Sequence, residues 1–514
     1  MLARVLSAST FGIDAYVVEV EVDLAYGAPA FTTVGLPEGA VKESKDRVQA
    51  AIKNSGFKFP IRRITVNLAP ADIKKEGAAF DLPIAIGILA AIGEVPPLPL
   101  REYLMLGELS LDGSLRPVKG VISVALDCRQ RNLKGIILPR ANVGEAAVVG
   151  GINALAADSL AEVVDFLRGN REIVPTASNA EELFREHSEY PVDFADVKGQ
   201  EHAKRALEVA AAGAHNILMI GPPGSGKTML ARRLPTILPR LELEEALDAT
   251  RIHSVAGVLA PGSALVTTRP FRSPHHSISD MALIGGGAIP RPGEVSLSHN
   301  GVLFLDELPE FHRNVLEVLR QPLEDGRVTI GRAKLTLTFP ARFTLAAAMN
   351  PCPCGYYTDQ TRQCVCTPHM IQKYRGRISG PLLDRIDLQI TVPALKYEEL
   401  AAKSPGEPSA AIRGRVNRAR ERQLERFAGL KRKRRIFANA QMETREIRRF
   451  CEVAPECDRL LRNAIEAFGY SARAYDRILK VARTIADLDA KPQIEPQHIS
   501  EAIQYRSLDR SVWK

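Results

Sequence analysis

The chain has 514 residues, of which 45% are hydrophobic and 25% charged, the balance of an ordinary globular protein. This length predicts about three domains, and without a run of roughly 18 apolar residues we expect no membrane-spanning helix. A net charge of +8 permits a nucleic-acid partner, although a basic solvated surface explains it equally well. Because seven cysteines occur without the apolar core of a signal peptide, we expect a cytoplasmic protein with reduced thiols.

Residues 1–170 are expected to form the first domain. Strand-like segments occur at 16–22 and 64–68, and helical segments are predicted at 41–55 and 82–92. This whole-domain pattern resembles the catalytic domain of Lon protease. The resemblance implies an α+β fold of the S5 domain 2-like type.

The same region lacks the catalytic pair of that family. Lon-type proteolysis requires a serine nucleophile activated by a lysine. Where the family carries its serine, the sequence reads Glu76-Gly-Ala-Ala-Phe-Asp81, so Ala79 takes the serine position. The lysine position falls near Ile122, and the neighbouring Lys119 has no serine to activate. We therefore expect a non-catalytic module for ring assembly and for contact with nucleic acid or a partner, followed by a linker at 171–190.

The clearest signature is Gly221-Pro-Pro-Gly-Ser-Gly-Lys-Thr228, which lies between an apolar run at 217–220 and a helical segment at 228–234. The spacing G-x-x-x-x-G-K-[ST] lets a glycine-rich turn point its backbone N–H groups at phosphate oxygens. The lysine then reaches the β- and γ-phosphates, and the hydroxyl ligates Mg²⁺. The sequence therefore predicts a site for ATP and Mg²⁺. Its residues are expected to be Gly221, Pro222, Pro223, Gly224, Ser225, Gly226, Lys227 and Thr228.

Two further strands are predicted to end at catalytic side chains. The apolar run 302–305 leads to Asp306 and Glu307, as expected of a strand buried in a parallel sheet. Asp306 would hold Mg²⁺ together with Thr228, and Glu307 would polarise the water that attacks the γ-phosphate. The strand at 344–349 leads to Asn350, which resembles the sensor-1 asparagine that helps to orient this water.

Two more segments resemble parts of AAA+ ATPases. The segment at 194–200 is similar to the one that lies beside the adenine, which implies that Val197 and Gly199 lie near the base. A helix is predicted to begin at Ser471, and on it Arg473 is our candidate for the sensor-2 arginine. Arg477 is the second candidate, because residues four apart lie on nearly the same helix face.

Residues 379–388 read Ser-Gly-Pro-Leu-Leu-Asp-Arg-Ile-Asp-Leu. They resemble the arginine-finger motif of magnesium-chelatase and minichromosome-maintenance ATPases. The resemblance implies that Arg385 completes the ATP site of a neighbouring subunit, and a finger supplied in this way requires a ring. The alternative is an ion pair within the chain, to Asp384 or Asp387.

Between the two phosphate motifs lie Arg269-Pro-Phe-Arg-Ser-Pro-His-His276 and a glycine-rich stretch at 285–299. They strongly resemble the magnesium-chelatase-like ComM (YifB) family, and the Lon-like domain extends the resemblance to essentially the whole chain. It implies a helix-2 insert and a hairpin of 326–330 with 335–339. The tip would place Arg332 and Lys334 where the pore of a ring follows a DNA backbone. The alternative is an exposed basic turn.

Four cysteines follow the expected sensor 1 in two close pairs. Four thiolates can hold Zn²⁺ tetrahedrally, so structural zinc is our first interpretation, ahead of free thiols and a redox disulfide. Catalytic zinc is not expected, because four cysteines leave no open position. For the adjacent His275 and His276, polar contacts are a more common role than metal binding. The candidate zinc ligands are Cys352, Cys354, Cys364 and Cys366.

We expect an α/β protein with the Lon-like domain, a P-loop AAA+ core at 191–395 and a helical lid at 396–514. A basic cluster at 431–435 contacts nucleic acid or lies on a solvated face. The family resemblance implies a DNA motor, hexameric when active, with helicase activity that promotes branch migration during natural transformation. The alternatives are a metal-insertion motor like magnesium chelatase, an ATP-dependent protein-remodelling factor, and an ATP-dependent protease, against which Ala79 argues.

Overall fold

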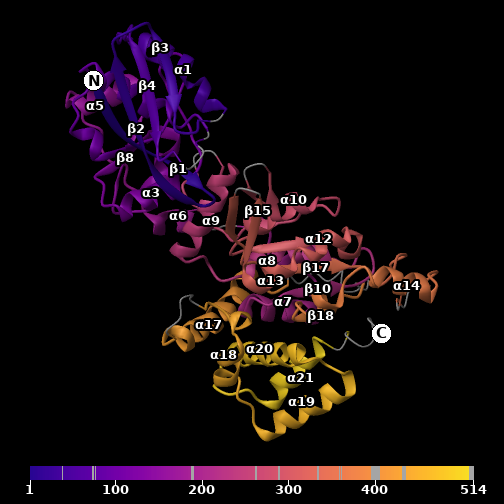
Figure 1. Ribbon diagram of the computed structural model, residues 1–514. Coiled ribbons are helices and arrows are strands. Elements are labelled where there is room, and N and C mark those ends of the chain that lie inside the picture. The colour runs from indigo at the N-terminus through magenta and orange to yellow at the C-terminus, as the bar shows by residue number, and fades with distance from the viewer. Residues whose placement is uncertain are drawn as a thin grey trace. The chain divides into compact units, whose positions relative to one another are not determined.

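The chain forms two compact units in the computed structural model (Figure 1). The first comprises residues 1–187 with 242–267, and the second residues 188–241 with 268–514. The chain thus leaves the second unit after residue 241 and returns at 268, inside the range expected for the ATPase core. The residues that the structure describes are 1–37, 39–71, 75, 77–186, 190–260, 263–287, 290–332, 335–357, 359, 362–394, 406–430, 436–506 and 508. Among them, none of the helices combines the length and the apolar character that crossing a membrane requires.

The first unit is built on a seven-stranded sheet in the order β3-β4-β2-β1-β5-β8-β9. The β1–β2 and β2–β4 pairs are antiparallel, and the other pairs are parallel. In β2, Val18, Val20 and Val22 are buried while Glu19 and Asp23 are exposed, which is the period of two of a strand with one buried face. The strands are β1 (Leu2–Phe11), β2 (Asp14–Ala25), β3 (Ala30–Val34), β4 (Arg63–Ala69), β5 (Tyr103–Met105), β8 (Gly135–Pro139) and β9 (Asn153–Ala157), beside a small hairpin of β6 (Glu108–Leu109) and β7 (Leu115–Arg116).

The helix α2 (Asp81–Ala91) is buried on nearly every side and packs on β1 and β2. Gly87 allows this approach, because a Cβ there would lie 2.6 Å from Val22 Cγ2. The helix α9 (Leu243–Ala256) joins the unit from far along the chain, and its Ser254 hydroxyl donates to Glu145 Oε2 at 2.6 Å. The elements expected from the sequence are present as β2, β4, α1 and α2. The other helices are α1 (Ala40–Asn54), α3 (Val121–Gln130), α4 (Val143–Ala147), α5 (Leu160–Arg168) and α6 (Ala180–Glu186).

The second unit contains a parallel five-stranded sheet in the order β11-β14-β17-β10-β18. Every residue of the three central strands is buried, as in a sheet covered on both faces. Ile220 pairs with Met349, and Leu305 pairs with Ala347, so these strands end at one edge. Open α/β sheets bind ligands at this carboxyl edge. The strands are β10 (Ile217–Ile220), β11 (Phe271–Arg272), β14 (Val302–Leu305), β17 (Thr344–Met349) and β18 (Leu388–Thr391).

Two antiparallel pairs stand outside this sheet. One joins β12 (Gly285–Gly286) to β13 (Arg291–Pro292), and the other joins β15 (Arg327–Arg332) to β16 (Leu335–Pro340). The second pair contains the hairpin that the sequence predicted, with Arg332 opposite Leu335. The helices of this part of the unit are α7 (Glu201–Gly213), α8 (Lys227–Ile237), α10 (Asp280–Ile284), α11 (Glu294–Leu297), α12 (Arg313–Glu317), α13 (Arg320–Asp325), α14 (Pro368–Arg375) and α15 (Gly380–Leu383).

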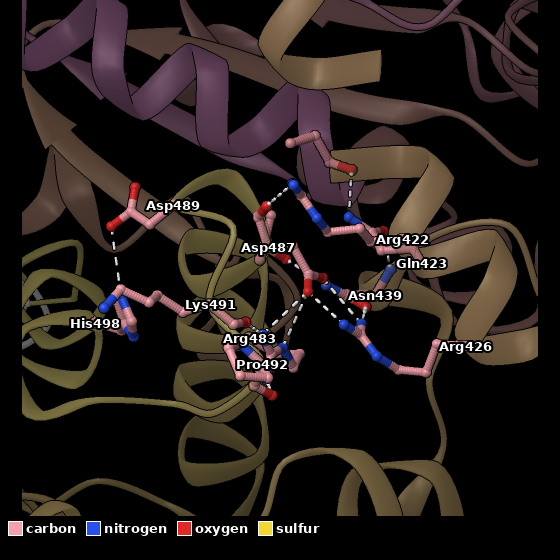
Figure 2. Close-up of polar contacts among 12 residues, drawn as sticks. Arg422, Gln423, Arg426, Asn439, Arg483, Asp487, Asp489, Lys491, Pro492 and His498 are labelled. Carbon is pink, nitrogen blue, oxygen red and sulfur yellow. Dashed lines mark hydrogen bonds and ion pairs between the residues drawn. The ribbon is translucent and has the colours of Figure 1, made fainter. Parts of the chain in front are cut away.

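The C-terminal part of the second unit is helical, and α17 and α20 pack against α7 (Figure 1). Its interior contains a buried carboxylate, Asp487 (Figure 2). Arg426, Arg483 and Asn439 donate to this carboxylate, and Arg422 donates to the backbone oxygen of the same residue at 2.8 Å. Because a buried charge requires such partners, the network fixes α17 against α20. The helices are α17 (Ser409–Ala428), α18 (Thr444–Phe450), α19 (Pro455–Phe468), α20 (Ala472–Leu488) and α21 (Pro496–Gln504).

Candidate nucleotide site and its surroundings

The glycine-rich loop joins the end of β10 to the start of α8. Gly224 and Gly226 have φ values of +77° and +84°, a left-handed region that favours glycine. A Cβ on Gly221 would lie 2.1 Å from the Val392 carbonyl oxygen, whereas one on Gly224 would have no atom within 4 Å. The loop is therefore packed tightly at its start and open above Gly224. This opening, at the N-terminus of α8, suits a phosphate group.

Lys227 is buried at the base of the loop. Its ammonium donates to Gly221 O at 2.8 Å and to Pro222 O at 2.9 Å, and it lies 3.3 Å from Asn350 Oδ1. Burial lowers the pKa of Lys227, while the negative charges of Asp306 and Glu307 act against this shift. The structure thus brings the lysine of the loop and the asparagine after β17 into direct contact.

Thr228 and Asp306 meet beside this lysine. The Thr228 hydroxyl donates to Asp306 Oδ2 at 2.6 Å. Mg²⁺ takes oxygen ligands and keeps several of its waters when a protein supplies only one or two groups, so a hydroxyl and a carboxylate in contact fit this ion. Both groups line a cavity of about 450 Å³, and the residues around it are Pro223, Gly224, Ser225, Gly226, Lys227, Thr228, Met229, Asp306, Glu307, Met349 and Asn350.

Family models match three parts of the chain. Residues 193–400 match the model described as magnesium chelatase, subunit ChlI, and residues 406–506 match the one for the C-terminal part of that subunit. Residues 20–142 match a model described as subunit ChlI of Mg-chelatase. The second unit therefore carries a magnesium-chelatase-type AAA+ domain followed by its helical region.

Competence protein ComM of Haemophilus influenzae is 47% identical over 516 residues, which cover 100% of this chain and 99% of that protein. The chain belongs to the ComM/YifB family. The YifB protein of Escherichia coli K12 is 46% identical over 512 residues, covering 99% and 98% of the two chains. A partial likeness to Lon protease 2 of Bacillus subtilis, 32% identical over 157 residues, covers 28% of this chain and 27% of that protein. The family and fold class predicted from the sequence are thus confirmed.

In this ComM-family chain, the segment expected beside the adenine contributes a residue that the sequence analysis did not single out. Gln200 Nε2 donates to Ser225 O in the phosphate loop at 2.7 Å. Its φ of 57° is unusual outside glycine, and among the described residues its buried Oε1 has no hydrogen-bond partner. A glutamine one residue after Gly199 gives no signal by itself that it will support the loop. Neither Val197, which is buried, nor Gly199 lines the cavity, and their place beside the base stays a prediction.

Arg385 lies at a different cavity, of about 460 Å³. Its Nη1 donates to Pro381 O at 2.7 Å, and its Nη2 forms an ion pair with Glu324. The intrachain partner is thus Glu324, not Asp384 or Asp387. This ion pair holds the pKa of Glu324 below its usual range. The expected role of Arg385 in a neighbouring site stays a prediction.

The two sensor-2 candidates differ in their surroundings. Arg473 is exposed near the start of α20. Arg477 forms an ion pair with the buried Asp387, and its Nη1 lies 3.3 Å from Arg385 O. Neither arginine lines the nucleotide cavity, so a sensor-2 role for Arg473 stays a prediction.

The four clustered cysteines have Sγ atoms within 4.8 Å of one another, and no disulfide joins them. Backbone N–H groups point at the sulfurs: Tyr357 N lies 3.3 Å from Cys352 Sγ. A hydrogen bond from the Tyr356 backbone lowers the pKa of Cys354 to about 6. Four close sulfurs that accept N–H donors fit a thiophilic metal such as Zn²⁺.

This cluster packs directly on the phosphate loop. A Cβ on Gly355, whose φ is +88°, would lie 2.5 Å from Pro223 Cδ. Arg375 Nε donates to Pro351 O, the residue after Asn350, at 3.0 Å, and its guanidinium lies over the Tyr357 ring. The cysteine segment and the nucleotide cavity therefore share a wall.

Two other expectations concern residues outside the nucleotide site. Arg332 ends β15, and Lys334 lies outside the described residues, so their contact with DNA stays a prediction. At the position of the Lon serine, Ala79 O accepts from Gly107 N at 3.0 Å. Ile122 is buried and Lys119 is exposed. The non-catalytic role expected for the first unit stays a prediction.

Proposed function

We propose that this protein hydrolyses ATP at the carboxyl edge of the parallel sheet. The observation that carries the proposal is the convergence of three strand ends, where Thr228 lies 2.6 Å from Asp306 and Lys227 lies 3.3 Å from Asn350. The backbone N–H groups of the loop and Lys227 bind the phosphates, and Thr228 with Asp306 holds the cation. When bound, Mg²⁺ would neutralise part of the negative charge of the phosphates.

In the chemical step, Glu307 is the general base. Its carboxylate accepts a proton from the attacking water, whose oxygen forms a bond to the γ-phosphorus. Asn350 orients this water. The bond between the γ-phosphorus and the bridging oxygen breaks, so ADP and phosphate leave, and Glu307 passes its proton to solvent. Lys227 stabilises the negative charge that develops on the phosphate oxygens.

We propose further that hydrolysis moves a ring of these chains, a hexamer when active, along single-stranded or branched DNA. Membership of the ComM family, whose Haemophilus influenzae protein is called a competence protein, supports this role. The basic residues Arg332 and Lys334, in the turn that the sequence predicts for this hairpin, would supply charges that bind a phosphate backbone. In such a ring, Arg385 completes the site of the neighbouring subunit. The expected activity is branch migration during recombination in natural transformation.

A four-way DNA junction with one labelled arm tests the motor. With ATP and Mg²⁺, the wild-type protein should convert the junction to its branch-migrated products, and Glu307→Gln should bind the junction without converting it. A protein that hydrolyses ATP but leaves every junction and forked duplex intact would overturn the proposal. That outcome would favour a metal-insertion or protein-remodelling motor.

We also propose that Cys352, Cys354, Cys364 and Cys366 hold a structural zinc ion. The support is the close approach of their sulfurs, with 3.3 Å between Cys352 and Cys354 and 3.7 Å between Cys352 and Cys364. Elemental analysis should find about one zinc per chain. The Cys364→Ser/Cys366→Ser variant should lose it, and Cys457→Ser, a buried thiol outside the cluster, should retain it. Equal metal content in all three proteins would contradict the assignment.

A further inference from the structure

The carboxylate proposed as the general base makes a side-chain contact that the hydrolysis mechanism does not use. Glu307 Oε2 lies 3.3 Å from His276 Nδ1. The backbone at Glu307 has a φ of 53° and a ψ of 45°, a left-handed conformation that is uncommon for residues other than glycine. Its N–H donates to Asp306 Oδ1 at 2.9 Å. The Glu307 side chain thus leaves the chain from a left-handed backbone position and lies beside His276.

His276 is itself held in place from two sides. Its ring lies 4.0 Å from the ring of His275 and 6.4 Å from that of Phe311, which meets it edge-on. His275 Nδ1 in turn lies 2.9 Å from Ser277 Oγ. Ring contacts of this kind fix the orientation of an imidazole as well as its position.

The strand before the loop of His276 pairs with the strand that precedes Glu307. β11 pairs with β14, with Arg272 opposite Leu303. Arg272 also forms a two-bond ion pair with Glu294, with N–O distances of 2.6 and 2.7 Å. A bidentate pair of this type is among the more rigid side-chain contacts. The distance between His276 and Glu307 is therefore set by neighbouring strands of one sheet.

We propose that His276 is a positioning residue, which orients the Glu307 carboxylate toward the attacking water at the rim of the nucleotide cavity. This inference rests on the proposed ATP hydrolysis. His276 lies outside the residues that line the cavity, so it acts through Glu307 and not on the nucleotide. Lys227 and Asp306 line the same cavity as Glu307, and Lys227 interacts electrostatically with its carboxylate. The contact between His276 Nδ1 and Glu307 Oε2 is therefore the observation on which the inference rests.

The test compares ATP turnover and ATP affinity in four full-length proteins: wild type, His276→Ala, His276→Gln and His369→Ala. In His276→Ala, kcat should fall about tenfold, while Kd for ATP should stay unchanged. This loss is smaller than the roughly 10²–10⁴-fold contribution of a general base, because Glu307 itself is still present. His276→Gln should recover part of the rate, because its amide still donates to a carboxylate. His369 is an exposed histidine on α14, and its replacement should have no effect.

A double-variant comparison separates positioning from a merely structural role. In a Glu307→Gln background, His276→Ala should cause no further loss of turnover, because residues that act as a unit are not additive. An equal loss in both backgrounds, or a weaker Kd for ATP with unchanged kcat, would overturn the inference. If His276→Ala keeps full turnover while Glu307→Gln is inactive, the inference about His276 is also wrong. If Glu307→Gln itself keeps full turnover, the proposed hydrolysis mechanism is wrong.

Discussion

Arg385 forms an ion pair with Glu324 of its own chain. The arginine is buried, and its Nε finds no hydrogen-bond partner in the part of the chain that the structure describes. The Glu324 side chain is 57% exposed. An arginine that completes the ATP site of a neighbouring subunit must exchange this carboxylate for a phosphate. If Arg385 is the finger proposed above, Glu324 and the phosphate of a neighbouring nucleotide would compete for one guanidinium.

This competition predicts that Glu324→Gln raises ATP turnover. The gain should be up to about fivefold, because an ion pair with an exposed partner is worth about 0.2–1 kcal/mol. The gain should disappear when Arg385→Ala is added. Glu317→Gln is a matched control, since Glu317 lines the same cavity but pairs with Arg320 at 2.8 Å. If the Arg385→Ala/Glu324→Gln protein is still faster than Arg385→Ala alone, Glu324 does not act through Arg385.

Asp387 predicts a pH-dependent contribution to stability. Burial alone would raise the pKa of this carboxyl, but the charge of Arg477 and the contact with His215 outweigh it and hold the pKa below its usual range. A lowered pKa in the folded state gives stability that is present above the unfolded value of about 3.9 and is lost as the pH falls below it.

Asp387→Asn should therefore lower the free energy of unfolding at pH 7 by about 3 kcal/mol, the cost of leaving a buried charge without its partner. The difference from wild type should shrink on acidification below about pH 4. Denaturant titrations at several pH values measure it. A difference as large at pH 3 as at pH 7 would contradict the ion-pair explanation.

Because the cysteine cluster packs on the phosphate loop, we expect a substitution at Gly355 to affect ATP binding. Gly355→Ala introduces a Cβ 2.5 Å from Pro223 Cδ at a φ of +88°. The strain at such a position is about 1 kcal/mol or more. If a shift of the phosphate loop relieves it, ATP binding should weaken about fivefold or more. Gly414→Ala on α17 is the control, because the nearest atom to its Cβ is a side-chain end 3.8 Å away. Unchanged ATP affinity in Gly355→Ala would show that the two segments are not coupled.

Thr228 should be required for Mg²⁺-dependent turnover. Thr228→Ala removes the hydroxyl that donates to Asp306. Turnover should fall about 10- to 100-fold, since a hydrogen bond to a charged group contributes about 1.5–3 kcal/mol. Thr228→Ser keeps the hydroxyl and should retain most of the rate. Equal loss in both variants, measured over a range of Mg²⁺ concentrations, would argue that the methyl group and not the hydroxyl matters.

The features that the sequence predicted are motifs whose residues lie close together along the chain. The loop that ends at Thr228 and the buried strands before Asp306 and Asn350 each lie in one short stretch, and the carboxyl edge of a parallel sheet brings such stretches together. Contacts between distant residues could not be read in the same way. The Gln200–Ser225 and His276–Glu307 contacts depend on how separate segments meet, and residue types alone do not encode this.

The partner of Arg385 was missed for a related reason. The sequence suggested acidic neighbours, Asp384 or Asp387, but the structure assigns Glu324 to Arg385 and Asp387 to Arg477. The packing of residues 242–267 with the first unit was also unexpected, because nothing local in this segment distinguishes it from the ATPase core. In both cases the outcome depends on contacts between residues that are far apart in the sequence.

The central claim is that ATP hydrolysis serves movement on DNA. Its most direct test is the ATP turnover rate with and without single-stranded, duplex and four-way-junction DNA, at a fixed salt concentration because binding to phosphates depends on salt. Glu307→Gln is the inactive control. We predict strong stimulation by DNA, and we predict that Lys334→Ala loses this stimulation. Turnover that is the same with and without every DNA, at low as well as physiological salt, would contradict the claim.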